Sequence, residues 1–317
     1  MKARQTADGK PLGLVLNIQH FCTNDGPGLR TTVFLKFCSL RCKWCSNPES
    51  IHPQPELAYK AAGCIGAKDC GLCLPLCPEG ALSVSDLDGK VRVNYDLCTD
   101  CGLCANACPP KALSMFGHEM TVDEVLAEVE QDESFYRDSG GGITLSGGEC
   151  LLQPDFSAAL LAEAHRRGIN TAIETAGNVP WEFMSKVLPH VDTMLHDHKL
   201  TDPARHKAWC GADNTRILAN FRRAYETFPD VRFIARTPVI PGVNDDEAHI
   251  RSVLDFIRPY PNVVDYQLLP YFRYGEAKYE FLGRVYELRD FDPPPETVMR
   301  RLNKIIDAAF QRNSEGA

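Results

Sequence analysis

The sequence predicts an α/β fold: a partial, TIM-like (β/α)6 barrel with a small cysteine-rich module inserted in it. Three observations predict this fold. Apolar, strand-like runs alternate with helical stretches after residue 118, which is typical of parallel β/α units. Together with one earlier run they make six strands, fewer than the eight of a closed barrel. Eight of the 14 cysteines gather in residues 64–108. We therefore expect barrel segments at 1–58 and 118–317, with an insert at 59–117.

The composition is that of an ordinary globular chain. Its 317 residues carry a net charge of −8 and a pI near 5.6, which favours neither nucleic acid nor an acidic membrane surface as a partner. No run approaches the ~18 apolar residues of a membrane span, and the N-terminal MKARQTADGK lacks the apolar run of a signal peptide. We expect a cytoplasmic protein, in which so many cysteines indicate metal rather than disulfides.

The first predicted barrel strand is residues 31–37, TTVFLKF. After the insert, Thr121 and Glu124 form a capping box ahead of a helix. The apolar residues of that helix recur at helical spacing, at Val122, Val125, Leu126 and Val129. The second strand is expected at residues 142–145, where GITL is apolar and follows a glycine-rich turn.

The remaining elements continue the alternation. A helix is expected to begin with Asp155 as its cap and to end at Gly168. The last helix is expected to begin near Pro295. Four further strands are predicted at residues 170–175, 192–197, 231–237 and 263–271.

Unusual strings follow the predicted strands. Functional residues in such barrels lie at the carboxyl ends of the strands. The strings there are CSLRC (38–42), SGGE (146–149), ETAGN (174–178), HDHK (196–199), RTPVIPG (236–242) and LLPYFRYG (268–275). Their shared position predicts one functional site at this edge of the sheet.

Three cysteines of the first string and its neighbour, Cys38, Cys42 and Cys45, are separated by three and then two residues. A cubane iron–sulfur cluster usually takes four protein thiolates, so three leave one iron open to another ligand. Zinc is the alternative, because it binds four ligands, or three and a water, and thiolates suit both metals.

The insert carries two further cysteine runs. The second, Cys98, Cys101, Cys104 and Cys108, has the bacterial ferredoxin spacing C-x2-C-x2-C-x3-C-P, and the first run, Cys64, Cys70, Cys73 and Cys77, has three extra residues after Cys64. In two-cluster ferredoxins the fourth cysteine of each run ligates the other cluster. The expected sets are therefore Cys64, Cys70, Cys73 with Cys108, and Cys98, Cys101, Cys104 with Cys77. Two zinc ions are the alternative. The isolated cysteines are expected to be structural: Cys22, Cys150 and Cys210.

These motifs resemble those of the radical S-adenosylmethionine (SAM) superfamily. DGPGLR (25–30), WCSNPES (44–50) and SGGGITLSGGE (139–149) resemble in particular the glycyl radical enzyme activating enzymes. The resemblance implies a radical SAM barrel with a ferredoxin-like insert, three [4Fe-4S] clusters and SAM as cofactors. It also implies that the cluster on Cys38, Cys42 and Cys45 is catalytic and that its open iron chelates the methionine part of SAM.

The resemblance also implies the contacts of SAM. Trp44 would lie beside the adenine, and Glu149 would accept hydrogen bonds from the methionine ammonium next to Gly147 and Gly148. Polar groups at the following strand ends would approach SAM or a cation: Glu174, Thr175, Asp197, Lys199 and Arg236. A structural ion pair is the alternative role for Arg236.

Two residues depart from the family pattern. Phe272 stands where pyruvate formate-lyase activating enzyme, which lacks the insert, has a histidine near SAM. Phe37 stands where the family commonly has glycine, so we expect the cysteine loop to enter its turn differently.

The partners implied are a glycyl radical enzyme, which receives the radical on a backbone glycine, and a flavodoxin or ferredoxin as electron donor. The two insert clusters would relay electrons; a structural or docking role is the alternative. Two other functions stay open on the residues alone, a multi-cluster electron-transfer protein and a radical SAM enzyme acting on a small molecule.

Overall fold

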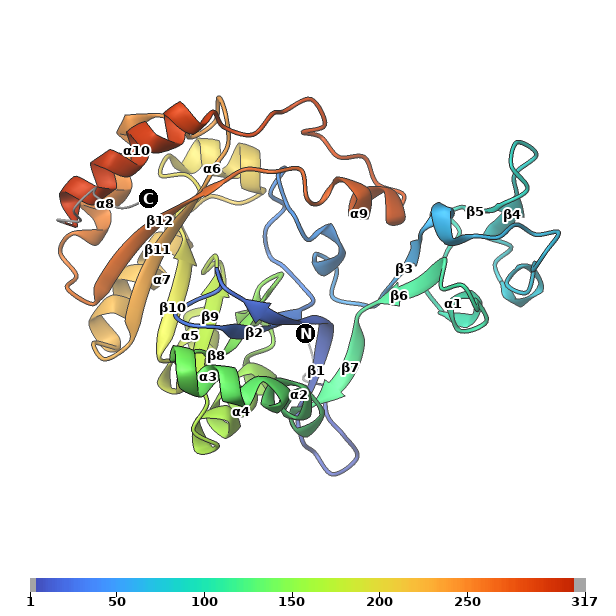
Figure 1. Cartoon of the computed structure of the whole chain (residues 1–317), viewed down its shortest axis with the longest axis horizontal. Coiled ribbons are helices and arrows are strands. Elements are labelled where there is room, and N and C mark those ends of the chain that lie inside the picture. Colours follow the sequence, from blue (N-terminus) through green and yellow to red (C-terminus); the bar gives the residue numbers. More distant parts are fainter. Residues whose placement is uncertain (1–3, 311–317) are drawn as a thin grey trace.

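The computed structural model describes residues 4–310 and contains an open, eight-stranded sheet (Figure 1). The order of its strands is β12-β11-β10-β9-β8-β2-β1-β7. Neighbours from β2 to β12 pair in parallel, which confirms the six predicted barrel strands. They are β2 (Arg30–Leu35), β8 (Gly142–Gly147), β9 (Asn170–Thr175), β10 (Thr193–Asp197), β11 (Arg232–Val239) and β12 (Val263–Pro270).

Two antiparallel strands that the sequence analysis did not predict extend the sheet beyond β2. They are β1 (Leu12–Cys22), which pairs with β2, and β7 (His118–Thr121), which pairs with the first half of β1. The pairing of β1 with β2 shifts register twice, and only its second half alternates between half-buried and exposed residues. Strand β1 is therefore recognised by its pairing with β2 and β7, because its burial pattern has no clear period of two along its whole length.

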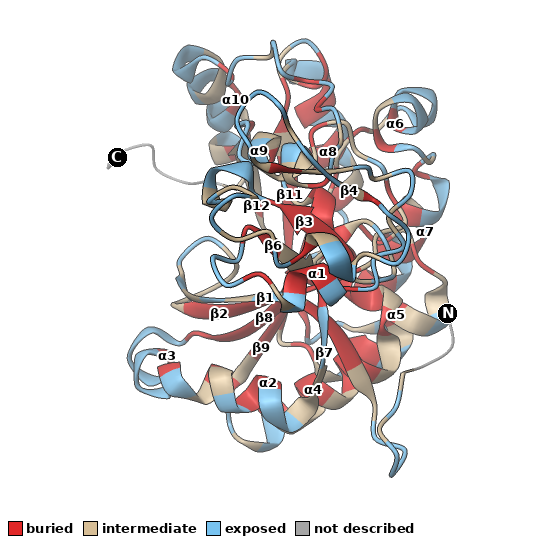
Figure 2. Ribbon diagram, turned by 90° about the vertical axis from the view of Figure 1, so that its right-hand side faces the viewer, coloured by how far each residue is buried: buried red, intermediate tan, exposed pale blue. Residues whose placement is uncertain are grey.

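Helices cover the outer face of the sheet (Figure 1). The strands and the inward sides of these helices together form the main buried apolar cluster (Figure 2). The capping box of Thr121 and Glu124 is confirmed. The helices are α2 (Val122–Val129), α3 (Glu133–Ser139), α4 (Pro154–Arg166), α5 (Trp181–Val187), α6 (Pro203–Cys210), α7 (Thr215–Thr227), α8 (Glu247–Ile257), α9 (Glu276–Phe281) and α10 (Glu296–Ala309). Between residues 4 and 310, no helix has the length and apolarity that crossing a membrane requires.

The helix starts confirm one prediction and correct another. The last helix begins after Pro295, as predicted. The prediction of Asp155 as a cap is wrong, because the cap lies two residues earlier, at Gln153, and Pro154 is the first residue of α4. Proline favours the first helical position because its fixed φ suits a helix and its missing N–H would be unpaired there. Asp155 instead pairs with Lys186 of the neighbouring helix α5.

The cysteine-rich segment projects from one side of the sheet (Figure 1). Strands β3 (Glu56–Tyr59) and β6 (Leu113–Phe116) form an antiparallel ribbon that leads into it. Beyond the ribbon lie the hairpin of β4 (Leu82–Val84) and β5 (Val91–Val93) and the short helix α1 (Leu103–Asn106). Its apolar residues form a separate cluster that includes Leu57, Val91 and Leu113. The described residues 4–310 also contain six 3-10 turns: η1 (Pro48–Ser50), η2 (Ala61–Gly63), η3 (Leu74–Leu76), η4 (Glu130–Asp132), η5 (Cys150–Leu152) and η6 (Leu188–His190).

Candidate active site

The cysteine loop leaves the carboxyl end of β2, and its three thiols are free. The amide of Cys38 donates to the carbonyl oxygen of Ile51 at 3.2 Å, and the amide of Cys45 donates to that of Cys42 at 3.1 Å. Burial raises the pKa of Cys38 and raises that of Cys45 to about 12, with the neighbouring Cys42 adding to both shifts. Without a metal these thiols are therefore protonated, and binding one would release their protons.

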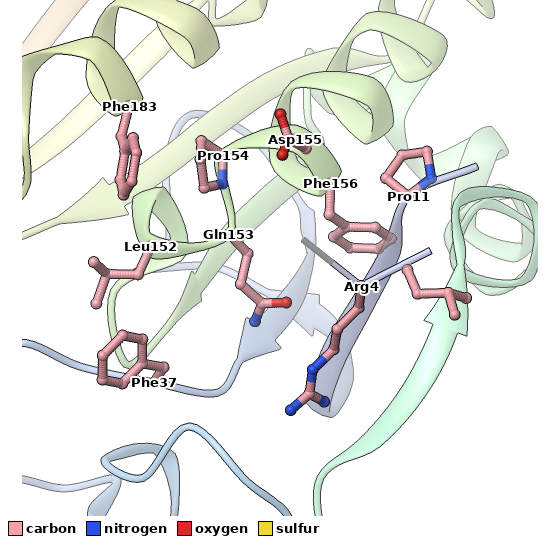
Figure 3. A pocket seen from close by; sticks show the side chains of 10 residues that line it. Arg4, Pro11, Phe37, Leu152, Gln153, Pro154, Asp155, Phe156 and Phe183 are labelled. Atoms are coloured by element: carbon pink, nitrogen blue, oxygen red, sulfur yellow. The ribbon is translucent and has the colours of Figure 1, made fainter. Parts of the chain in front are cut away.

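Phe37 introduces the loop with a left-handed backbone, at φ +85°. Glycine adopts this conformation freely, whereas a side chain makes it unfavourable. The backbone at Phe37 thus takes the conformation that glycine favours. Phe37 therefore departs from the glycine of the family in its side chain rather than in its backbone turn. The ring of Phe37 forms one wall of a cavity of about 190 Å³, together with Leu152, Phe156 and Phe183 (Figure 3).

Gly147 and Gly148 lie where the end of β8 meets the cysteine loop. A Cβ at Gly147 would stand 2.3 Å from the carbonyl oxygen of Leu35, and one at Gly148 would stand 2.4 Å from that of Phe37. The amide of Glu149 donates to the carbonyl oxygen of Phe37 at 2.8 Å. In this structure the two glycines allow the backbones of two strand ends to touch, and their contact with SAM stays a prediction.

Glu149 is fully buried and joins the end of β8 to the turn after β9. Its carboxylate accepts hydrogen bonds from the Thr175 hydroxyl at 2.7 Å and from the amides of Ala176, Gly177 and Leu151 at 3.0, 3.2 and 3.3 Å. Burial raises the pKa of Glu149, and these four donors oppose that shift. Thr175 and Glu149, both predicted to approach SAM, are thus partners of each other.

Two ion pairs occupy the ends of β9, β10 and β11. Arg236 pairs with Glu174, whose other carboxylate oxygen accepts a hydrogen bond from the Ser146 hydroxyl at 2.5 Å. The Lys199 ammonium lies 2.6 Å from the carboxylate of Asp197. Burial raises the pKa of Glu174. Burial opposes the charge of Lys199, but Asp197 raises its pKa above the usual value.

The turn before β2 also contacts this charged region, through Arg236. Arg236 donates to the carbonyl oxygen of Asn24 at 3.0 Å, and the carboxylate of Asp25 accepts from the Thr32 hydroxyl at 2.7 Å. Among the described residues, the buried Nε of Arg236 has no hydrogen-bond partner. A cavity of about 530 Å³ lies between this turn and β12, with Arg236 and Gln267 in its lining. Arg236 therefore lines this cavity, although its Nε is buried.

Cys210, expected to be merely structural, lies against the cysteine loop. The amides of Arg41 and Lys43 donate to the carbonyl oxygens of Cys210 and Trp209 at 2.8 and 3.0 Å. These bonds hold the end of α6 on both sides of Cys42. A hydrogen bond with the Cys210 thiol, together with burial, raises the pKa of Cys42. The sequence carries no local signal for this contact, because the two cysteines meet only through the fold.

The other isolated cysteines have no such position. Cys150 is fully buried in the main core, and its thiol donates to the carbonyl oxygen of Glu174 at 3.4 Å. Cys22 is half-buried at the end of β1. The structural role expected for both stays a prediction.

Trp44 and Phe272, the two aromatic residues that the family pattern singles out, lie in different surroundings. Trp44 is buried in an apolar cluster with Leu40 and Leu200, and its ring centroid is 6.2 Å from that of Trp209. Its contact with an adenine stays a prediction. Phe272 is 39% exposed after β12, with its ring 5.2 Å from that of Tyr274.

The eight insert cysteines surround two cavities. Cys98, Cys101, Cys104 and Cys77 line one, and Cys64, Cys70, Cys73 and Cys108 line the other. The fold thus brings together the two crossed sets that the spacing predicted, and Cys64 lies in its set despite the wider gap. Within residues 4–310, no three His, Cys, Asp or Glu side chains converge closely enough to hold a single metal ion. Four thiols around a common cavity are the donor set of a cubane cluster.

Similarity to known proteins shows the family of this chain. Residues 99–254 match the radical SAM superfamily, and residues 58–112 match a 4Fe-4S dicluster domain. The chain is 49% identical to the isethionate sulfite-lyase activating enzyme of Desulfovibrio desulfuricans, and the match covers 87% of this chain and 88% of that one. It belongs to the glycyl radical enzyme activating enzymes. Activating enzymes of this family are radical SAM enzymes, so iron–sulfur clusters and SAM are its cofactors.

Other activating enzymes match over similar lengths. The (2S)-3-sulfopropanediol sulfolyase activating enzyme of Bilophila wadsworthia is 47% identical, with 94% of this chain and 98% of that one covered. The choline trimethylamine-lyase activating enzyme of Oleidesulfovibrio alaskensis is 42% identical, with coverage of 87% and 88%. The chain thus matches, over most of its length, activating enzymes that are named for different partner enzymes.

Proposed function

We propose that the activating enzyme holds its catalytic cluster on Cys38, Cys42 and Cys45 and binds SAM over the ends of β8 to β11. When bound there, cluster and SAM together supply a 5′-deoxyadenosyl radical, formed by one-electron cleavage of SAM, that takes hydrogen from a backbone glycine of the partner enzyme. The observation that carries this proposal is the position of the three free thiols beside two ion pairs at one edge of an open sheet.

The ion pair of Asp197 and Lys199 suits the methionine part of SAM, which carries an ammonium and a carboxylate. The two side chains are 29% and 12% exposed, and both act electrostatically on Cys42. Lys199 would attract the carboxylate as a point charge, while Asp197 would attract the ammonium. The pair is already formed, so little side-chain ordering is needed when the ligand binds.

Arg236 is proposed to lie between bound SAM and the partner enzyme and to bind the backbone of the partner. It is 6% exposed, is fixed by Glu174 and the Asn24 carbonyl, and keeps one buried N–H without a partner in the described chain. A buried donor of this kind gains a hydrogen bond when a ligand arrives. An extended backbone segment entering the cavity beside β12 would supply the carbonyl oxygen that this N–H lacks.

Glu149 and the two glycines before it are proposed to position the site. Glu149 fixes the turn at 175–177 to the end of β8, and the glycines let that end touch the cysteine loop. These contacts hold the loop and the SAM-binding strand ends at a constant separation. Holding reactive groups in fixed geometry is the main contribution of the protein in cofactor chemistry.

We further propose that the chain carries three [4Fe-4S] clusters and receives electrons from a flavodoxin or ferredoxin. The two crossed cysteine sets each surround a cavity, which supports one cluster in each. The insert at 59–117 would thus be the entry point for electrons.

The proposed partner is a glycyl radical enzyme that cleaves a carbon–sulfur bond of a sulfonate. Four relatives named for a sulfite-lyase or a sulfolyase are 46–49% identical to the chain. Relatives named for indoleacetate decarboxylase, sulfopropanediol dehydratase and choline trimethylamine-lyase are 38–42% identical.

Electron paramagnetic resonance tests the function directly. The reconstituted, reduced protein is mixed anaerobically with SAM and with each of three enzymes, an isethionate sulfite-lyase, a sulfopropanediol sulfolyase and a choline trimethylamine-lyase. We expect a glycine-centred doublet with one of the first two and none with a Cys42→Ala variant. A doublet with choline trimethylamine-lyase alone would reject the sulfonate-cleaving partner. Formation of 5′-deoxyadenosine with no doublet from any enzyme would reject all three as partners.

A further inference from the structure

The short helix α9 lies between the cysteine loop and the insert (Figure 1). Its N-cap residue, Gly275, touches the loop, because a Cβ there would stand 2.6 Å from the carbonyl oxygen of Cys45. The Lys278 ammonium donates to the carbonyl oxygen of Ser46 at 3.1 Å and lies 2.6 Å from the carboxylate of Glu49. The start of α9 is therefore fixed to the segment that follows the third cysteine.

The other end of α9 is fixed to the insert through Tyr95. The Tyr95 hydroxyl donates to the carbonyl oxygen of Phe281 at 2.6 Å. The Tyr95 ring also lies on the backbone of Gly283, where a Cβ would stand 2.2 Å from it. Because six helical residues at 1.5 Å rise span about 9 Å, one short helix separates the Cys45 backbone from Tyr95.

Tyr95 belongs to the turn that leads into the second cysteine run. The amide of Cys98 donates to the carbonyl oxygen of Asn94 at 3.1 Å, so Tyr95 and Cys98 are held in one turn. Strand β3 reaches the same place, since the amide of Leu57 donates to the Asp100 carboxylate at 2.7 Å. The barrel thus meets the insert at the cavity lined by Cys98, Cys101, Cys104 and Cys77, which Leu57 also lines.

The second cysteine set lies further out along the ribbon. Its cavity is lined by Tyr59, two residues beyond Leu57 on β3, a step of about 7 Å along a strand. Tyr59 contacts Cys64, and burial together with this contact raises the pKa of Tyr59 to about 12. The two sets therefore differ in their distance from the cysteine loop.

An aromatic side chain of α9 faces the loop itself. Tyr279 packs against the apolar cluster that also contacts Cys38 and Cys42. Its ring centroid is 4.9 Å from that of Tyr286, whose hydroxyl is 2.7 Å from that of Tyr271. Packed protein atoms, rather than solvent, thus continue from Tyr95 through α9 to the predicted catalytic cysteines.

We infer that α9 and Tyr95 form the electron bridge to the catalytic cluster and that the two insert clusters act in a fixed order. The set with Cys64 is the outer one and receives an electron from the donor. The set with Cys98 is the inner one and passes the electron across α9 to the site of Cys38, Cys42 and Cys45. One electron leaves the donor for each SAM cleaved, and each insert cluster is reduced and then reoxidised, so neither changes over a turnover. This order rests on the proposed electron relay.

Magnetic coupling between reduced clusters tests the order without SAM. The spin-lattice relaxation of the catalytic cluster is measured by pulsed electron paramagnetic resonance in variants that lack one insert cluster, Cys101→Ala for the inner set and Cys70→Ala for the outer. We expect fast relaxation to be lost in Cys101→Ala and kept in Cys70→Ala. The reverse result would overturn the order.

A pair of glycine variants tests the bridge with all clusters in place. Gly283→Ala presses a methyl group into the Tyr95 ring, whereas Gly80→Ala introduces one at a similar φ, +61° against +64°, with no atom within 4 Å. Both variants thus carry the same backbone penalty, and only the first disturbs the bridge. We expect reduction of the catalytic cluster by reduced flavodoxin to slow in Gly283→Ala and to stay at the wild-type rate in Gly80→Ala. Equal rates in the two variants would overturn the bridge.

A chemical reductant separates this inference from the proposed function. Dithionite reduces the catalytic cluster directly, so SAM cleavage driven by it should be the same in Gly283→Ala and wild type. If the wild-type protein with dithionite does not cleave SAM, the proposed function fails while the coupling measurement still decides the order of the clusters. If Gly283→Ala loses cleavage with dithionite as well, α9 acts on the site itself, and the bridge is rejected.

Discussion

The Lys36 ammonium and the Glu56 carboxylate lie 2.9 Å apart, in side chains that are 0% and 9% exposed. Lys36 immediately follows β2 and Glu56 begins β3, so their ion pair closes the base of the segment that carries the cysteine loop. Lys36 also donates to the carbonyl oxygen of Glu49 at 2.7 Å, and Arg284 pairs with Glu56 from the segment after α9. Burial lowers the pKa of Lys36, and its contact with Glu56 opposes that shift. The pair thus connects barrel, loop and insert.

Removal of one partner should cost more than removal of both. Glu56→Leu leaves a buried ammonium without its counter-charge, and such a loss typically costs about 3–5 kcal/mol of unfolding free energy. The double variant Lys36→Met/Glu56→Leu replaces the pair by apolar groups and should recover the part of that loss that the buried ammonium causes, while the half-buried Arg284 loses its partner in both variants. Anaerobic urea unfolding followed by circular dichroism measures both. A double variant no more stable than the single one would contradict this account of the pair.

At position 37, glycine should give a more stable protein than alanine. Phe37→Ala and Phe37→Gly both remove the ring, but only alanine keeps a Cβ at φ +85°. We expect the glycine variant to be more stable by about 1 kcal/mol, measured as the difference in unfolding free energy. The matched pair at the exposed Phe135 of α3, in a helix, should show the opposite order, since glycine is unfavourable there by about 1 kcal/mol.

Glu149 should stabilise the site before any SAM binds. Glu149→Gln keeps only one acceptor oxygen, so two of the four donors lose their partner and face an NH₂ group, at a cost of about 1–3 kcal/mol. Thr175→Val, the control, removes one donor and leaves the carboxylate three. We expect a lower anaerobic melting temperature for Glu149→Gln without SAM, and a smaller decrease for Thr175→Val. A variant of unchanged stability that only binds SAM more weakly would identify Glu149 as a ligand contact instead.

Local signals in the sequence were enough to predict the parallel strands and the cysteine sets. Apolar runs identify β2 and β8 to β11 because strands buried on both faces need no alternation, whereas β12, at the edge of the sheet, is only partly buried. Cysteine spacing identifies the crossed sets because each run must wrap a cluster of fixed size. Long-range contacts carry no such signal. Tyr95 meets Phe281 across 186 residues, and Cys210 meets Cys42 through the end of α6.

The same distinction explains why the contacts of the predicted SAM residues could not be foreseen. Their positions at the carboxyl ends of the strands follow from the parallel sheet, except for Trp44, which lies in the cysteine loop, and Arg236, which lies inside β11. Their partners depend on which side chains the fold turns toward each other. The Glu174 carboxylate meets Arg236, and the Glu149 carboxylate meets the Thr175 hydroxyl and three backbone amides. In the folded chain these residues are paired with one another, and the ion pair of Arg236 with Glu174 is the alternative that the sequence left open for Arg236.

Acid should destabilise the barrel through a buried histidine. His196 is fully buried at the end of β10, with its ring centroid 4.7 Å from that of Phe221 and its Nε2 2.5 Å from the Tyr225 hydroxyl. Burial lowers the pKa of His196 from 6.5 to about 4. Between these values the unfolded chain binds a proton that the folded chain does not. Stability from this group is therefore complete above pH 6.5 and decreases as the pH falls toward 4.

The expected slope from His196 is at most about 1.4 kcal/mol per pH unit below its unfolded pKa. Urea unfolding at pH 7.5 and pH 5.5 measures it, with the clusters retained anaerobically at both. His196→Gln cannot take up the proton, so its stability should change less between the two values than that of the wild type. His118→Gln, at an exposed position of β7, is the control and should follow the wild type. Cluster loss in acid is common to all three proteins, and burial also lowers the pKa of His198, His206 and His249. A pH response in His196→Gln equal to that of the wild type would therefore assign the effect to these other groups rather than to the His196 imidazole.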